Sequence, residues 1–166
     1  VLNTEKVDVL CNGESTGMIT ASGSGGVAPY QFSINAGAFS ANNVFSNLAA
    51  GTYTIHLKDA NGCEKTAVVT ITQPALAVLN TQKVDVLCNG ESTGMITASG
   101  SGGVAPYQFS INAGAFSANN VFSGLAAGTY TIHLKDANGC EKSAVVTITQ
   151  PALAVLSTEK VDVLCN

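Results

Sequence analysis

Apolar and polar side chains alternate along most of the chain, a pattern typical of β-strands that bury one face. In residues 52–58 the alternation places Tyr53, Ile55 and Leu57 on one face and polar side chains on the other. The same period marks further segments of the first 77 residues, at 6–10, 17–22, 30–34, 44–45 and 63–72. Because no stretch keeps a helical period, we predict an all-β unit of about seven short strands.

Turn residues separate these segments at regular intervals. Asn35-Ala36-Gly37 is typical of a hairpin turn, and residues 59–62 end in Asn-Gly, a pair in which both residues tolerate positive φ. Residues 22–26 are rich in glycine, but a phosphate-binding loop would be followed by a lysine and a helix. We therefore interpret this segment as a connection between strands.

The whole pattern occurs twice and then begins again. Residues 1–77 return as 78–154 with three differences, Glu5/Gln82, Asn47/Gly124 and Thr66/Ser143, and residues 155–166 open a third copy. A 77-residue period is long enough for an independent small domain, unlike the shorter repeats of solenoids. We therefore expect tandem domains arranged as beads on a string, within an excerpt of a longer protein.

A local motif narrows the expected topology. Leu48, Gly51 and Tyr53 have the spacing of a tyrosine corner, in which the phenol at the start of a strand bonds back to the preceding turn. The second copy repeats the motif with Leu125, Gly128 and Tyr130. The motif favours immunoglobulin-like β-sandwiches, and the alternative is that each tyrosine is an ordinary core aromatic.

Composition excludes several classes of protein. The chain is 46% hydrophobic and 11% charged, with a net charge of −4. Its seven basic residues are scattered, which disfavours nucleic-acid binding, and no apolar run is long enough to insert in a membrane. We expect a folded, mildly acidic protein with a hydroxyl-rich surface suited to the cell exterior.

The five cysteines predict disulfides and an oxidising compartment. If Cys11 ends the first strand and Cys63 begins the last, they lie at opposite ends of one unit, too far apart for a bond. Segments 63–72 and 79–88 have equal lengths and flank a turn, so a hairpin register would pair Cys63 with Cys88. The equivalent pair is Cys140 with Cys165, and the folded units would then shift to residues 12–88 and 89–165.

The order of motifs in each copy resembles the SprB-type repeat of Bacteroidota gliding-motility adhesins. The resemblance rests on Cys11-Asn12-Gly13, residues 17–20, Gly25-Gly26 before Pro29-Tyr30, and residues 48–53, 58–63 and 71–74. Typical members carry an aromatic pair after the Pro-Tyr step, often ending in Trp, whereas this chain has Gln31-Phe32. The resemblance covers each full copy.

The resemblance implies a long extracellular filament that is exported by the type IX secretion system and moved along the cell surface by the gliding machinery. Its implied partners are neighbouring repeats, that machinery, and an extracellular substratum or polysaccharide. The chain more distantly resembles PKD-like sandwiches, which bridge within one repeat. That resemblance implies the alternative pairs Cys11 with Cys63 and Cys88 with Cys140.

Candidate chemistry in the sequence is sparse. His56 and His133 occupy outward strand positions without a neighbouring nucleophile, so we predict no catalytic residues and no enzyme. Residues 59–62 resemble the start of a calcium loop, but the later acidic ligands are missing, so a calcium site is possible and disfavoured, and no metal ligand or cofactor is predicted. We expect a structural shaft, with weak glycan or surface binding by each repeat as the alternative.

Overall fold

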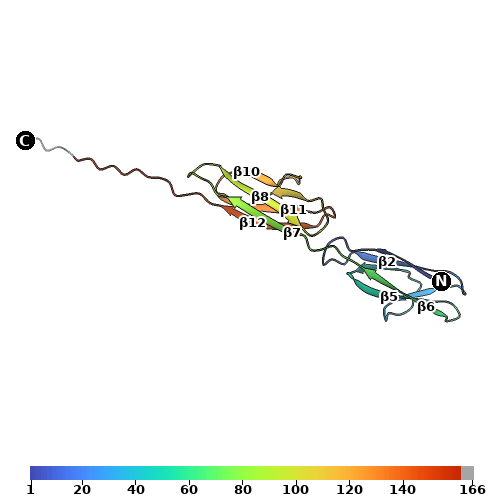
Figure 1. The fold of residues 1–166 in the computed structure, drawn as a ribbon. Helices are drawn as coiled ribbons and strands as arrows, with labels where there is room; N and C mark the ends of the chain where they lie inside the picture. The colour runs from blue at the N-terminus through green and yellow to red at the C-terminus, as the bar shows by residue number, and fades with distance from the viewer. Residues whose placement is uncertain (162–166) are drawn as a thin grey trace, which may run out of the picture. The chain divides into compact units, whose positions relative to one another are not determined.

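The computed structural model describes residues 1–161 and consists of β-strands, turns and irregular segments. The first copy forms six strands: β1 (Leu2–Val7), β2 (Gly17–Gly23), β3 (Gln31–Ile34), β4 (Val44–Leu48), β5 (Gly51–Lys58) and β6 (Glu64–Ile71). The second forms β7 (Val78–Val84), β8 (Gly94–Ser101), β9 (Gln108–Ile111), β10 (Val121–Leu125), β11 (Gly128–Lys135) and β12 (Glu141–Ile148). Each copy therefore has six strands, not the expected seven. Figure 1 draws the strands as arrows.

Each copy folds into two antiparallel three-stranded sheets. In the first copy the orders are β1-β2-β4 and β3-β5-β6, and in the second they are β7-β8-β10 and β9-β11-β12. These orders match the A-B-E and C-F-G arrangement of an immunoglobulin-like sandwich without strand D. The missing strand accounts for the lower count, and the tandem all-β sandwich fold is as expected.

The alternating positions form the core of each sandwich. In the first copy, Ile19, Ile55 and Ile71 are fully enclosed, and Phe32 and Leu57 pack beside them. Phe45, Leu48 and Tyr53 are partly buried against this cluster. The inward residues of β5 are those that the alternation predicts, because one face of each sheet must meet the other to leave water.

The tyrosine corner is present in both copies. The Tyr53 hydroxyl donates a hydrogen bond to the carbonyl of Ala49 over 2.9 Å, and Tyr130 bonds Ala126 over 3.0 Å. Both tyrosines lie near the start of the strand that corresponds to F, next to the turn after β4 or β10. The predicted role of Leu48-Gly51-Tyr53 and Leu125-Gly128-Tyr130 as a structural corner is confirmed.

The hairpin predicted between the copies is wrong. β6 is an edge strand of sheet β3-β5-β6, whereas β7 pairs with β8 in another sheet. The strands of residues 1–77 therefore pair among themselves, as β1 does with β2 from Leu2–Gly23 to Val7–Met18. Strand pairing gives no support to units shifted to 12–88 and 89–165. Residues 155–161 of the third copy form no strand.

By compactness the chain divides into two units. The first contains Val1–Val78 together with two loop segments from the second copy, Gly100–Tyr107 and Lys135–Lys142. The second begins with Leu79–Ser99 and Gln108–Leu134 and continues from Ser143. The loop segments contact the segments that follow β1 and β6 in the first copy.

Candidate functional site

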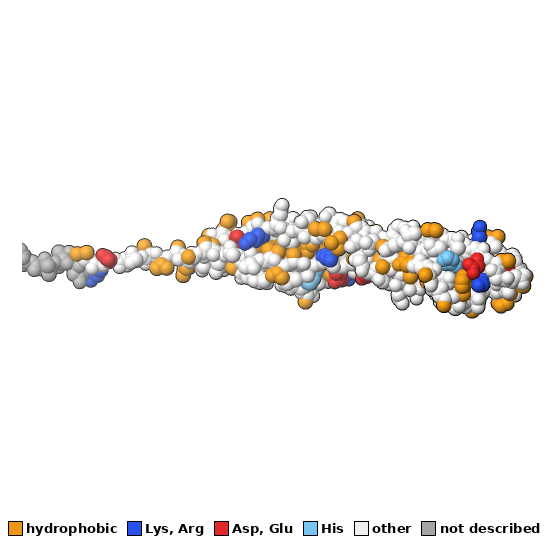
Figure 2. Space-filling view, turned by 90° about the horizontal axis from the view of Figure 1, so that it is seen from below, with side chains coloured by type: hydrophobic (Ala, Val, Ile, Leu, Met, Phe, Trp, Pro, Cys, Tyr) orange, Lys and Arg blue, Asp and Glu red, His pale blue; other side chains and the backbone are white. Residues whose placement is uncertain are grey.

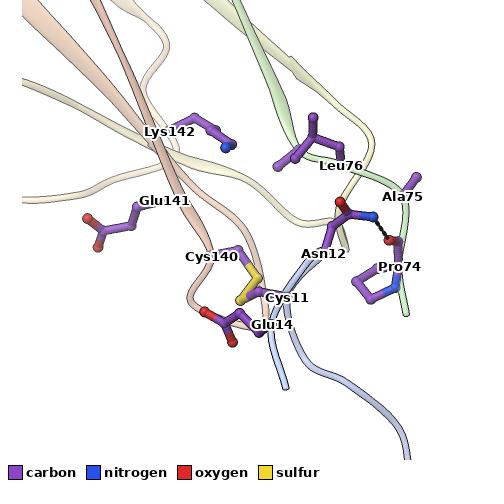
Figure 3. A pocket seen from close by; sticks show the side chains of 10 residues that line it. Cys11, Asn12, Glu14, Pro74, Ala75, Leu76, Cys140, Glu141 and Lys142 are labelled. Carbon is purple, nitrogen blue, oxygen red and sulfur yellow. Dashed lines mark hydrogen bonds between the residues drawn. A yellow bond between two sulfur atoms is a disulfide. The ribbon is translucent and has the colours of Figure 1, made fainter. Parts of the chain in front are cut away.

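The segment after β1 and the segment after β6 form a groove in the first unit. Cys11, Asn12 and residues 74–77 line it on one side, and Cys140–Lys142 line it on the other (Figure 3). We call the surface formed by Cys11, Asn12 and residues 74–77 the Cys11 groove. We call residues 135–142 the Cys140 loop.

Hydrogen bonds hold the Cys11 groove in place. Asp8 accepts a bond from the backbone N–H of Thr72, and Asn12 donates its side-chain amide to the carbonyl of Pro74 over 2.9 Å (Figure 3). The N–H of Gly13 bonds the Gln73 side chain. The segment after β1 is thus fastened to the segment after β6, and Cys11 is positioned between them.

The charge of Asp8 contributes to this arrangement. Lys6 donates a hydrogen bond to the Asp8 carboxylate over 2.8 Å, and the Thr72 N–H donates another. These two contacts, the Lys6 bond first, hold the pKa of the Asp8 carboxyl below its usual range. Asp85 has the same partners in the second copy, Lys83 and Thr149, and its pKa is lowered in the same way.

The Cys140 loop is a turn built around one carboxylate. Asp136 accepts backbone N–H bonds from Asn138, Cys140 and Val104 over 2.9 to 3.0 Å. Asp59 does the same in the first copy with Asn61, Cys63 and Val27, and the Cys63 and Val27 bonds lower its pKa. Because backbone donors use both oxygens of each carboxylate, this segment acts as a turn, as expected from residues 59–62.

Cys11 and Cys140 form a disulfide within the first unit. Their Cα atoms are 5.7 Å apart, inside the range that a disulfide requires, and the two residues are separated by 129 positions in the sequence. Asn138 donates its side-chain amide to the carbonyl of Leu10, and the N–H of Gly103 bonds the carbonyl of Ala75, both within 2.9 Å. Hydrogen bonds thus accompany the covalent bond.

The predicted pairing of Cys63 with Cys88 is wrong, since both cysteines are free and exposed. The alternative pairs, Cys11 with Cys63 and Cys88 with Cys140, are also wrong. Cys11 lies by the end of β6 and Cys63 precedes its start, so the length of an eight-residue strand, roughly 25 Å, separates them. Cys140 bonds Cys11, and the predicted partner Cys165 lies outside the described residues.

Other candidate chemistry remains unsupported by a cluster of side chains. His56 meets the ring of Phe39 edge-on at 6.4 Å, and His133 meets Phe116 at 6.5 Å. Within residues 1–161, no three His, Cys, Asp or Glu side chains gather where they could hold a metal ion. Charged side chains are few and scattered on the face drawn in Figure 2, without a basic stripe.

No helix in the described part of the chain is long and apolar enough to cross a lipid bilayer.

Comparisons with known proteins find one matching family model. The SprB repeat family matches residues 3–39 and 80–116, at equivalent positions of the two copies. No curated protein matches the chain. One matching solved structure is the C-terminal 282-residue fragment of intimin in complex with the intimin-binding domain of its translocated receptor, with a TM-score of 0.47 and 12% identity. The match covers 89% of this chain and 63% of that fragment, less than two thirds of its length. The SprB repeat model therefore matches the chain once in each 77-residue copy.

Proposed function

We propose that this chain is part of the shaft of a secreted cell-surface adhesin that supports attachment and gliding motility. The observation that carries the proposal is the SprB repeat in each of two nearly identical sandwiches. Identical copies extend a structure by repetition, whereas an enzyme concentrates different polar groups in one place. The role is therefore structural and non-enzymatic.

The disulfide is consistent with a location outside the cytoplasm, where thiols are not kept reduced. It also suits a shaft under load. A force applied to the ends of the chain cannot extend the segment between Cys11 and Cys140 while the bond is intact. With 129 positions between the two cysteines, up to roughly 460 Å of chain is withheld, at about 3.6 Å per residue.

The location and role can be tested on cells that produce the protein. Antibodies against this chain should label intact cells, and in-frame removal of the repeats should reduce attachment and gliding. Labelling that needs permeabilised cells, or unchanged attachment and gliding after the removal, would contradict the proposal.

A binding assay separates the shaft from its alternative, a weak glycan- or surface-binding module. The purified chain should be retained neither on polysaccharide nor on glass above the level of an unrelated sandwich domain. Retention that increases steeply when chains are joined in longer arrays would indicate that each repeat binds and that avidity supplies the adhesion.

A further inference from the structure

The chain contains a second copy of the loop that enters the Cys11 groove. Residues 58–65 and 135–142 have the same sequence, and Asp59 organises the first as Asp136 organises the second. We call residues 58–65 the Cys63 loop. Cys140 is partly buried and bonded, whereas Cys63 is exposed and free. The Cys63 loop therefore has the shape of its counterpart without its partner.

The chain also contains a second copy of the groove, formed in the second unit by Leu87, Cys88, Asn89 and Pro151–Ala154. We call it the Cys88 groove. Asn89 donates its side-chain amide to the carbonyl of Pro151 over 3.0 Å, and the N–H of Gly90 bonds Gln150, as their counterparts do in the Cys11 groove. The Cys88 groove is thus held by the same hydrogen bonds although its cysteine is free.

Exposure shows what this second groove lacks. Leu10 is 52% exposed and its counterpart Leu87 is 75% exposed. Leu76 is 49% exposed and Leu153 is 67% exposed. Ala77 is buried, whereas Ala154 is exposed. In the Cys11 groove, loops of the second copy cover part of the apolar surface. In the Cys88 groove the equivalent apolar surface is exposed to water.

We propose that the Cys88 groove binds the Cys63 loop of a second copy of this chain, and that Cys88 and Cys63 then form a disulfide equivalent to Cys11–Cys140. The chemistry is thiol–disulfide exchange with a small oxidised disulfide such as glutathione disulfide. One protein thiolate displaces a glutathione thiolate, and the second protein thiolate then displaces the other. The protein thiols lose two electrons, which reduce glutathione disulfide to two glutathione molecules.

The backbone around Gly25 also leaves room for docking of the Cys63 loop into the Cys88 groove. In the occupied groove, the N–H of Gly103 bonds the carbonyl of Ala75, and Gly102 lies so close to the Leu76 carbonyl that a Cβ would overlap it. Gly25 is the counterpart of Gly102 in the first copy, has positive φ as well, and has no backbone carbonyl near the position of a Cβ. The pairing joins two different surfaces head to tail, so it adds copies in one direction.

The test uses two variants of the full chain, Cys63→Ser and Cys88→Ser, both with Cys165→Ser. Each variant has one free thiol besides the Cys11–Cys140 pair. The two are mixed in equal amounts in a glutathione redox buffer, and peptide mapping identifies each disulfide at equilibrium. We expect the ratio of Cys63–Cys88 heterodimers to homodimers to exceed the ratio from random pairing by a factor of at least roughly ten, a preference of ~1.4 kcal/mol.

Two results would overturn the proposal: heterodimers and homodimers in random proportion, or no dimers at all. A matched control adds Gly25→Ala to the Cys88→Ser variant and leaves every thiol unchanged. It should return the pairing to random proportions, because the new Cβ would overlap the carbonyl of Leu153 in the groove. An excess that survives this change would show that the thiols do not pair through the docked loop. The outcome does not depend on whether the protein is an adhesin.

Discussion

The Cys11 groove and the Cys88 groove have the same residues and the same internal hydrogen bonds, yet only one is occupied. Asn12 and Asn89 bond equivalent proline carbonyls over 2.9 and 3.0 Å. The difference is that Cys11 is bonded to Cys140, whereas Cys88 is free and exposed. Local sequence thus builds the groove, and a segment from another copy completes it. A substitution that removes contacts with the Cys140 loop should change stability at the Cys11 groove only. Substitutions in the hydrogen bonds that hold each groove together, which we call the cradle, should have similar effects in both copies.

Loss of the disulfide should have the largest effect. Replacing Cys11 and Cys140 by Ser should lower the free energy of unfolding by about 2–4 kcal/mol, because the bond closes a long loop in the unfolded chain. Cys88→Ser should change it by less than about 0.5 kcal/mol, since this side chain is exposed and unbonded. Urea denaturation of the variants measures both, and equal losses would remove the distinction between the grooves.

The backbone contact can be tested with a matched pair of glycines. Gly102 and Gly25 have similar positive φ values, 66° and 71°, so replacing either by Ala imposes a similar backbone strain. Only the Cβ at position 102 would also overlap the Leu76 carbonyl. Gly102→Ala should therefore be more destabilising than Gly25→Ala by about 1–3 kcal/mol, the usual cost of overpacking. Thermal unfolding measures the difference, and equal shifts would show that the contact contributes nothing.

The tyrosine corner tests a feature that does not depend on occupancy. Tyr53→Phe and Tyr130→Phe each remove one hydrogen bond of 2.9 or 3.0 Å to a turn carbonyl. Each should lower the free energy of unfolding by about 0.5–1.5 kcal/mol, and the two losses should be similar. Urea denaturation of the single variants checks this. A clear inequality would mean that the two sandwiches differ more deeply than at their grooves.

Features that depend on a few neighbouring residues could be predicted from the sequence. The spacing of Leu48, Gly51 and Tyr53 defines the corner because all three act around one turn. The alternation of apolar and polar residues predicted the inward face of β5 for the same reason. The end of β1 was harder to predict from the sequence. Val9 was expected in the strand, but it does not pair with β2, and its N–H bonds the carbonyl of Thr72 instead. Its side chain is buried, so its hydrophobicity alone could not show the change.

The partner of Cys11 could not be read from the pattern because the copies are nearly identical. Cys11 and Cys63 lie at opposite ends of one copy, as the sequence predicts, and they do not bond each other. Because each copy has a cysteine at each end, two consecutive copies can bring unlike ends together, as in the Cys11–Cys140 bond. The equal lengths of segments 63–72 and 79–88 predict a hairpin, but edge strands of different sheets can also have equal lengths.

The smallest expected effect concerns the cradle that both grooves share, and it depends on pH. The pKa values of Asp8 and Asp85 are lowered in the folded protein, chiefly by Lys6 and Lys83 and then by the N–H groups of Thr72 and Thr149. A lowered folded-state pKa adds stability above the unfolded value of about 3.8, and this stability is lost as the pH falls through the folded value. Asp8→Asn and Asp85→Asn should each flatten the decline of the free energy of unfolding between about pH 5 and pH 2, and by similar amounts. Urea denaturation at a series of pH values measures the slopes. Lys6 and Asp8 belong to the cradle and not to the contact with the Cys140 loop. A larger change of slope for Asp8→Asn than for Asp85→Asn would therefore mean that the bound loop strengthens the cradle. That result would contradict the view that the groove forms independently of its partner.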